Sequence, residues 1–100
     1  MKELLRANEG DTVATDHRDA QVGSLLLAVV CSLVDRPEKL EMALLVDAMG
    51  VSFQIHAAPE DLGKLIGKSG RTARAIRTIL SGNAAKHRRR YSVDFSKLPL

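Results

Sequence analysis

The run Leu65-Ile66-Gly67-Lys68-Ser69-Gly70-Arg71 lies between two segments whose apolar residues have helical spacing. Two glycines enclose a basic and a small polar residue, and this pattern predicts a tight turn between two helices. Glycine tolerates the positive φ that such a turn often requires, and it places no Cβ between the backbone and a ligand. We therefore expect the backbone of this turn to approach a phosphate chain closely.

The segments that flank the turn carry helix signals. Pro59 suits the first position of a short helix, which Gly67 ends. Residues 71–80 form a second helix, which either ends near residues 81–83 or continues weakly through residues 84–86. The spacing of its apolar residues predicts four buried side chains, namely Ala73, Ile76, Ile79 and Leu80.

The rest of the chain supplies one more helix and three strands. Asp19 is the expected N-cap of a helix over residues 20–35. Residues 40–46 and 51–56 have the pattern of a β-hairpin, and residues 90–95 alternate as a last strand. The apolar surface of the first helix is broad enough to face a sheet on one side and a second copy of the protein on the other. Its expected buried residues are Val22, Leu25, Leu26, Val29, Val30, Leu33 and Val34.

Composition indicates one small soluble domain with a polyanionic partner. The chain has 100 residues, of which 45% are hydrophobic and 27% charged. Residues 1–58 hold 5 Lys/Arg against 9 Asp/Glu, whereas residues 59–100 hold 10 against 3, so the net charge of +3 divides into −4 and +7. A basic half that carries the glycine turn favours a nucleic acid, although a solvated basic surface is the alternative. With only 3 aromatic residues, folds that stack bases on aromatic platforms are disfavoured.

Several other classes of protein are excluded. The single cysteine, Cys31, allows no internal disulfide and no cysteine-based zinc site, and the three histidines do not converge on a metal. Neither a signal peptide nor an apolar stretch of membrane-spanning length is recognisable, so we expect a cytoplasmic protein with no membrane contact. Residues 63–69 resemble a phosphate-binding P-loop, but that motif needs four residues between its glycines and here there are three. Ser69 has no base near it in sequence. No catalytic residue, metal, cofactor or small-molecule substrate is predicted.

The turn and the basic residues around it are the candidate binding site. Its amides precede a helix, where unpaired N–H groups and the helix dipole favour anions. Arg71, Arg74 and Arg77 recur every three residues along that helix, and Lys64 lies one turn before the glycines. Such a stripe can neutralise several phosphates, but for Arg77 a merely solvated role is equally expected. The run Lys86-His87-Arg88-Arg89-Arg90 either contacts distal nucleic-acid backbone or forms a flexible charged loop.

Residues 57–78, with the turn at Gly67-Lys68-Ser69-Gly70 and the helix start Arg71-Thr72-Ala73-Arg74-Ala75-Ile76-Arg77, closely resemble the bacterial small single-KH-domain RNA-binding proteins of the KhpA type. The resemblance extends over about residues 21–95. It implies a type II KH domain of the α+β class, with the order α-β-β-α-α-β and a three-stranded sheet backed by helices. It also implies a groove for about four nucleotides of single-stranded RNA.

The resemblance assigns roles to particular residues. Gly67, Lys68, Ser69 and Gly70 would clamp the sugar-phosphate backbone. Lys64, Arg71 and Arg74 would support them electrostatically, and Ile66 would line the groove against the bases. Members of this family are associated with RNA chaperoning or post-transcriptional regulation and with cell division and cell-wall synthesis. They form homodimers or pair with a larger KH-containing protein.

The expected organisation is an N-terminal extension over residues 1–18, a KH domain over residues 19–96 and a tail over residues 97–100. The extension and the short turn at residues 47–50 depart from the family pattern and leave the partner interface open. Besides RNA binding, the sequence allows a protein-interaction adaptor that acts through its apolar first helix. A small enzyme would need a pocket of convergent polar groups that these residues do not supply.

Overall fold

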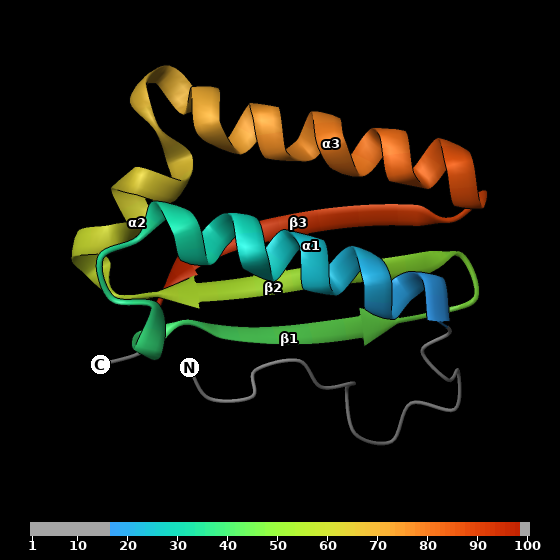
Figure 1. Cartoon of the computed structure of the whole chain (residues 1–100), viewed down its shortest axis with the longest axis horizontal. Coiled ribbons are helices and arrows are strands. Elements are labelled where there is room, and N and C mark those ends of the chain that lie inside the picture. The colour runs from blue at the N-terminus through green and yellow to red at the C-terminus, as the bar shows by residue number, and fades with distance from the viewer. Residues whose placement is uncertain (1–16, 99–100) are drawn as a thin grey trace.

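The computed structural model describes residues 17–98 of the chain. Three helices cover one face of a three-stranded sheet, and the helices and strands follow the order α-β-β-α-α-β (Figure 1). The predicted α+β class and element order are confirmed. Parts of the predicted extension and tail, residues 1–16 and 99–100, lie outside the described residues. The elements are α1 (His17–Leu33), η1 (Pro37–Lys39), β1 (Glu41–Val46), β2 (Gly50–Ala57), α2 (Pro59–Ile66), η2 (Lys68–Gly70), α3 (Arg71–His87) and β3 (Arg90–Lys97).

The sheet has the order β1-β2-β3 and mixes two kinds of pairing. Strands β1 and β2 are antiparallel, whereas β2 and β3 are parallel. Parallel neighbours need a long crossover connection, and here α2, the glycine turn and α3 provide it. Strand β3 is an edge strand because it comes last in the sheet order, and it lies beside α3 (Figure 1). This pairing places the end of β3 next to the helices that flank the glycine turn.

The hairpin between β1 and β2 is closed by a side chain and by a glycine. The carboxylate of Asp47 accepts hydrogen bonds from the backbone N–H groups of Met49, at 2.8 Å, and Gly50, at 3.0 Å. A Cβ on Gly50 would lie 1.8 Å from the carbonyl oxygen of Arg90, so only glycine allows β2 to begin this close to β3.

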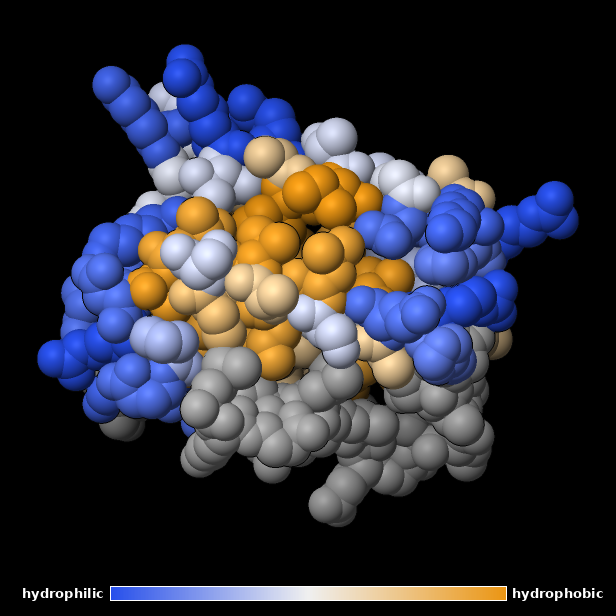
Figure 2. All heavy atoms as spheres, viewed as in Figure 1, coloured by the Kyte–Doolittle hydropathy of each residue, from blue (hydrophilic) through white to orange (hydrophobic). Residues whose placement is uncertain are grey.

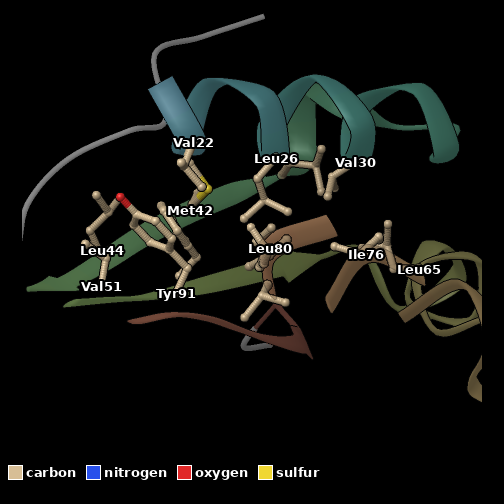
Figure 3. Packing of buried hydrophobic residues seen from close by; sticks show 14 of the residues in the cluster. Val22, Leu26, Val30, Met42, Leu44, Val51, Leu65, Ile76, Leu80 and Tyr91 are labelled. Carbon is tan, nitrogen blue, oxygen red and sulfur yellow. The ribbon is translucent and has the colours of Figure 1, made fainter. Parts of the chain in front are cut away.

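The core lies between the helices and the inward face of the sheet. Alternate residues of each strand point inward, and Phe53 of β2 is fully buried. Figure 3 shows Val22, Leu26 and Val30 of α1 directed toward the sheet, with Leu80 and Ile76 of α3 packed beside them. The buried apolar cluster consists of Val22, Leu26, Val30, Val34, Leu40, Met42, Leu44, Val46, Val51, Phe53, Ile55, Ala57, Leu65, Ile76, Leu80, Tyr91 and Val93.

The first helix differs from its prediction in bounds and in burial. It begins at His17, so Asp19 lies inside its first turn and is not its N-cap. The Asp19 side chain is completely buried, because it binds Arg89 and Tyr91. Leu25 and Leu33 were expected in the core but are 43% and 37% exposed. The sheet covers only part of the broad apolar face, and the rest remains on the surface.

The third helix, α3, is longer than the shorter of the two lengths that the sequence predicted for it. It continues through Gly82 to His87, and Arg88 follows as a left-handed residue. The basic run at residues 86–90 is therefore not one loop, since it spans the end of α3, two connecting residues and the start of β3. Ile79, predicted to be buried, is 46% exposed and lies on the same surface as Leu25.

Candidate nucleic-acid interface

The glycine turn has a backbone that only glycine adopts easily at both ends. Gly67 has a φ of 79° and Gly70 a φ of 74°, and Ser69 between them also has a positive φ, of 56°. A Cβ on Gly67 would lie 2.3 Å from the Thr72 hydroxyl oxygen and 2.8 Å from the Thr72 nitrogen. At Gly70, by contrast, the same Cβ would meet nothing within 4 Å. Gly67 is thus required by packing as well as by backbone conformation, while Gly70 leaves open space beside the turn.

Hydrogen bonds fix the turn to the helix on each side. The N–H of Gly67 donates to the carbonyl of Gly63 at 2.8 Å, and the N–H of Gly70 donates to that of Gly67 at 3.0 Å. The Arg74 guanidinium reaches back to the carbonyl oxygen of Ser69 at 3.4 Å. The left-handed conformation of Ser69 is a local strain of the kind that surrounding structure maintains at ligand clamps.

The turn borders a groove of about 560 Å³ that combines apolar and charged walls. Ile66, which is 39% exposed, and Ala73 supply apolar surface from the helices, and Phe95 supplies it from β3. A surface of this kind suits the flat faces of bases. The complete lining is Ile66, Gly70, Ala73, Arg74, Arg77, Asp94 and Phe95.

Two arginines of α3, Arg74 and Arg77, line this groove, and Arg77 also contacts β3. Its guanidinium donates to the carbonyl oxygen of Val93 at 3.3 Å and lies 5.8 Å from the centre of the Phe95 ring. A cation over an aromatic face is attracted by the electrons of the ring. Arg77 therefore connects α3 to the edge strand and keeps its positive charge at the groove.

The Lys64 side chain lies among carboxylates and does not line the groove. Its ammonium group forms an ion pair with Asp35 and lies 3.5 Å from the carboxylate of Asp61. The hydrogen bond to Asp35 is the main reason that the pKa of Lys64 is raised above its ordinary value. Two carboxylates thus face this cation before any ligand is present.

Asp61 joins α2 to the loop that follows α1. Its carboxylate is buried and accepts the backbone N–H groups of Asp35, at 3.1 Å, and Arg36, at 2.9 Å. Burial alone would raise the pKa of Asp61, but the two backbone donors and the Lys64 ammonium outweigh burial and lower it. Helix α2, which precedes the glycine turn, is therefore anchored near its N-terminus to the loop after α1 by the charged side chain of Asp61.

The structure brings most of the predicted site residues together around the groove. Ile66, Gly70 and Arg74 line it directly, and Gly67, Lys68 and Ser69 form the adjoining turn. Arg71 is exposed at the start of α3. Sequence reasoning did not find Asp94 and Phe95, and it left Arg77 undecided. The strand pattern at residues 90–95 identified an alternating face, but nothing local indicated that this strand would border the groove.

Comparison with known proteins gives the family. The model of the family described as "KhpA/KhpB, KH domain" matches residues 24–95 of the chain. The chain belongs to this family. The fold described above is accordingly a type II KH domain, as the sequence predicted.

The chain covers two thirds or more of the length of each of three relatives in the KhpA/KhpB family. The RNA-binding protein KhpA of Clostridium acetobutylicum is 39% identical over 70 residues, which is 70% of this chain and 93% of the relative. The RNA-binding protein KhpA of Caldanaerobacter subterraneus subsp. tengcongensis is 37% identical over 73 residues, 73% of this chain and 97% of the relative. The protein of the same name from Mycobacterium tuberculosis is 41% identical over 54 residues, 54% of this chain and 68% of the relative. No solved structure gives a significant match.

Two other expectations concern catalysis and membrane-spanning helices. These relatives are named RNA-binding proteins, and neither name describes a catalytic activity. Among residues 17–98, no helix has both the length and the apolar character needed to cross a membrane.

Proposed function

We propose that this protein binds single-stranded RNA and holds about four nucleotides in the groove beside the glycine turn. The observation that carries the proposal is the positive-φ turn at Gly67–Gly70, which opens onto a groove with apolar and cationic walls. Single-stranded RNA presents bases to apolar surface and phosphates to cations, so both walls have a matching part of the ligand. The relatives named RNA-binding protein support this choice of ligand.

In this proposal the charged and the apolar residues of the groove have different tasks. The turn and the exposed cations Lys68, Arg71 and Arg74 bind the sugar-phosphate backbone, while Ile66 and Phe95 contact base faces. Lys64, already paired with Asp35 and Asp61, contributes at longer range and mainly positions α2. Because backbone contacts dominate, the affinity is expected to fall steeply with salt and to depend weakly on sequence.

A charge reversal in the turn tests RNA binding directly. The double variant Lys68→Asp with Ser69→Asp is expected to keep its melting temperature within a few degrees and to lose at least about tenfold in affinity for a short fluorescent RNA, measured by anisotropy. The control Lys39→Asp with Ser24→Asp makes the same change in charge at exposed positions away from the turn. Equal RNA affinity in the folded turn variant and the control would rule out the proposed clamp.

We further propose that the protein acts in the cytoplasm as an RNA chaperone or post-transcriptional regulator, with effects on cell division and cell-wall synthesis through the RNAs it binds. A groove that holds only a few nucleotides of an unstructured RNA strand fits such a role, because the protein must also release the RNA easily. RNA cross-linked to the protein in cells, followed by sequencing, is the measurement that identifies these RNAs.

A second candidate role, association with another KH protein, is favoured by an exposed apolar surface on the helical face. Figure 2 shows hydrophobic side chains across the middle of this face, between hydrophilic groups at both ends. Leu25 is 43% exposed and Ile79 is 46% exposed. They border a shallow apolar groove between α1 and α3 whose lining is Leu25, Leu26, Val29, Ile76, Ile79 and Leu80. We propose that a second copy, or a larger KH-containing protein, covers this groove.

Solution mass tests the association. Leu25→Glu is expected to reduce a dimer to a monomer in size-exclusion chromatography with light scattering, because it places a charge in an apolar contact. Leu45→Glu is the matched control, since Leu45 is 40% exposed but belongs to β1, on the side of the sheet away from the helices. A wild-type protein that stays monomeric at high concentration would contradict the homodimer, and mixing with the larger partner would then test the heterodimer.

A further inference from the structure

The basic run at residues 86–90 is divided by the structure into paired and exposed cations. Arg89 turns inward and binds the buried Asp19 carboxylate. Arg90 is exposed at the start of β3, where it lines a small pocket together with Asp47. Lys86 and Arg88 are exposed, and no carboxylate of residues 17–98 forms an ion pair with them. The far end of α3 therefore carries two exposed cations with no carboxylate partner among residues 17–98.

Arg88 occupies a backbone position that normally favours glycine. It follows the last residue of α3 with φ 57° and ψ 39°, and its N–H donates to the carbonyl of Ala84. Helices commonly end in this left-handed conformation, and glycine adopts it without the steric cost that a Cβ adds. The Arg88 residue is exposed. A residue kept in a strained conformation at the surface points to a role for its side chain.

Arg88 lies just beyond the end of α3, the helix whose start borders the groove lined by Arg74. Arg74 and Ser81 are seven residues apart on α3, close to two helical turns, so they lie along one face of the helix, and Arg88 comes directly after its last residue, His87. Arg74 lines the groove, and Ser81 between the two arginines is small and exposed. Fourteen residues of helix rise about 21 Å. Figure 2 shows hydrophilic side chains at the end of the molecule where α3 finishes (Figure 1).

We propose that the C-terminal end of α3 is a second phosphate-binding site for the same single-stranded RNA, with Arg88 as its main cation and Lys86 beside it. The inference rests on the proposed RNA binding at the glycine turn. A strand with stacked bases advances about 3.4 Å for each phosphate, so 21 Å corresponds to about six nucleotides beyond the groove. The groove holds four nucleotides, and the second site extends the bound length to about ten.

The alternative role for these cations is electrostatic support of the helix end. Lys86 lies in the last turn of α3, where positive charge interacts favourably with the helix dipole. That role stabilises the fold but gives no dependence on the length of an RNA. RNA length and protein stability therefore separate the two explanations.

The experiment compares uridine oligonucleotides of four and twelve nucleotides by fluorescence anisotropy, with wild type, Arg88→Gly and Arg88→Lys. A twelve-nucleotide strand offers nine registers to a four-nucleotide groove, so statistics alone make it about ninefold tighter. Wild type is expected to exceed this ratio by about fivefold or more, and Arg88→Gly to return to about ninefold with unchanged four-nucleotide affinity. Arg88→Lys keeps the charge and should retain most of the gain. Arg88→Gly is also expected to melt about 2–5 °C higher, so that its weaker binding cannot come from unfolding.

Two controls separate failure of this inference from failure of RNA binding itself. Lys39→Gly removes an exposed cation outside α3 and should leave the length ratio at the wild-type value. The turn variant Lys68→Asp with Ser69→Asp should lose affinity for both oligonucleotides. If both RNAs bind wild type but Arg88→Gly keeps the full length gain, the second site is wrong while the groove stands. If the turn variant binds both RNAs as wild type does, the proposed groove is wrong and the second site, which depends on it, falls with it.

Discussion

The buried carboxylate of Asp19 and the guanidinium of Arg89 meet in two parallel hydrogen bonds of 2.8 Å, although the residues are 70 positions apart. The phenol of Tyr91 donates a third bond to the same carboxylate at 2.7 Å. These contacts connect the first turn of α1 with the segment that joins α3 to β3. Two-point contact between a guanidinium and a carboxylate fixes direction as well as distance.

Removing one member of this pair is expected to destabilise the protein strongly. Asp19→Ala leaves Arg89, whose side chain is only 15% exposed, without its carboxylate, and should cost about 3–5 kcal/mol of unfolding free energy. The measurement is urea denaturation followed by circular dichroism. The double variant Asp19→Leu with Arg89→Met removes both charges and is expected to lose much less. A double variant as unstable as Asp19→Ala would show that the cost does not come from an unpaired charge.

The two glycines of the turn should respond differently to alanine. Gly67→Ala adds a Cβ against Thr72 at a positive φ and is expected to cost about 3 kcal/mol, whereas Gly70→Ala meets open space and should cost about 1 kcal/mol. Thermal unfolding measures both. Equal costs would mean that backbone conformation alone, and not contact with Thr72, makes glycine necessary at position 67.

Stability is expected to fall in acid partly through Asp61. The folded state lowers the pKa of this carboxyl below its ordinary value of 3.8. Its contribution is therefore fully present above pH 3.8 and is lost as the pH falls through the lower folded pKa. In Asp61→Asn the unfolding free energy should vary less between pH 5 and pH 2 than in wild type. Glu38→Gln, at an exposed position, is the control and should keep the wild-type acid dependence.

Asp94 is the one carboxylate that lines the groove within residues 17–98, and it should repel the RNA backbone. Asp94→Asn is therefore expected to bind a four-nucleotide RNA about threefold more tightly at low salt, with the difference shrinking as salt is added. Glu41→Gln, on β1 at the other edge of the sheet, should leave the affinity unchanged. Weaker binding by Asp94→Asn would contradict repulsion and would indicate that the carboxylate accepts a hydrogen bond from a base.

Several features of the site were predictable because their signals are local. The glycines at 67 and 70, the proline at 59 and the spacing of apolar residues predicted α2, the turn and the start of α3. Asp94 and Phe95 were not predictable, because their place at the groove follows from the parallel pairing of β3 with β2. A strand carries its alternation in its own sequence, but its neighbours depend on the whole chain.

The sequence by itself determined the kinds and order of the elements, the backbone of the glycine turn and the basic character of α3, since these depend on residues within a few positions of each other. Only the tertiary structure decided that β3 is an edge strand, that Asp19 is an ion-pair partner and not a helix cap, and that Leu25 and Ile79 remain on the surface. The physical reason is that burial and long-range pairing are set by competition among all the apolar faces and charges for a limited core. No local pattern records the outcome of that competition.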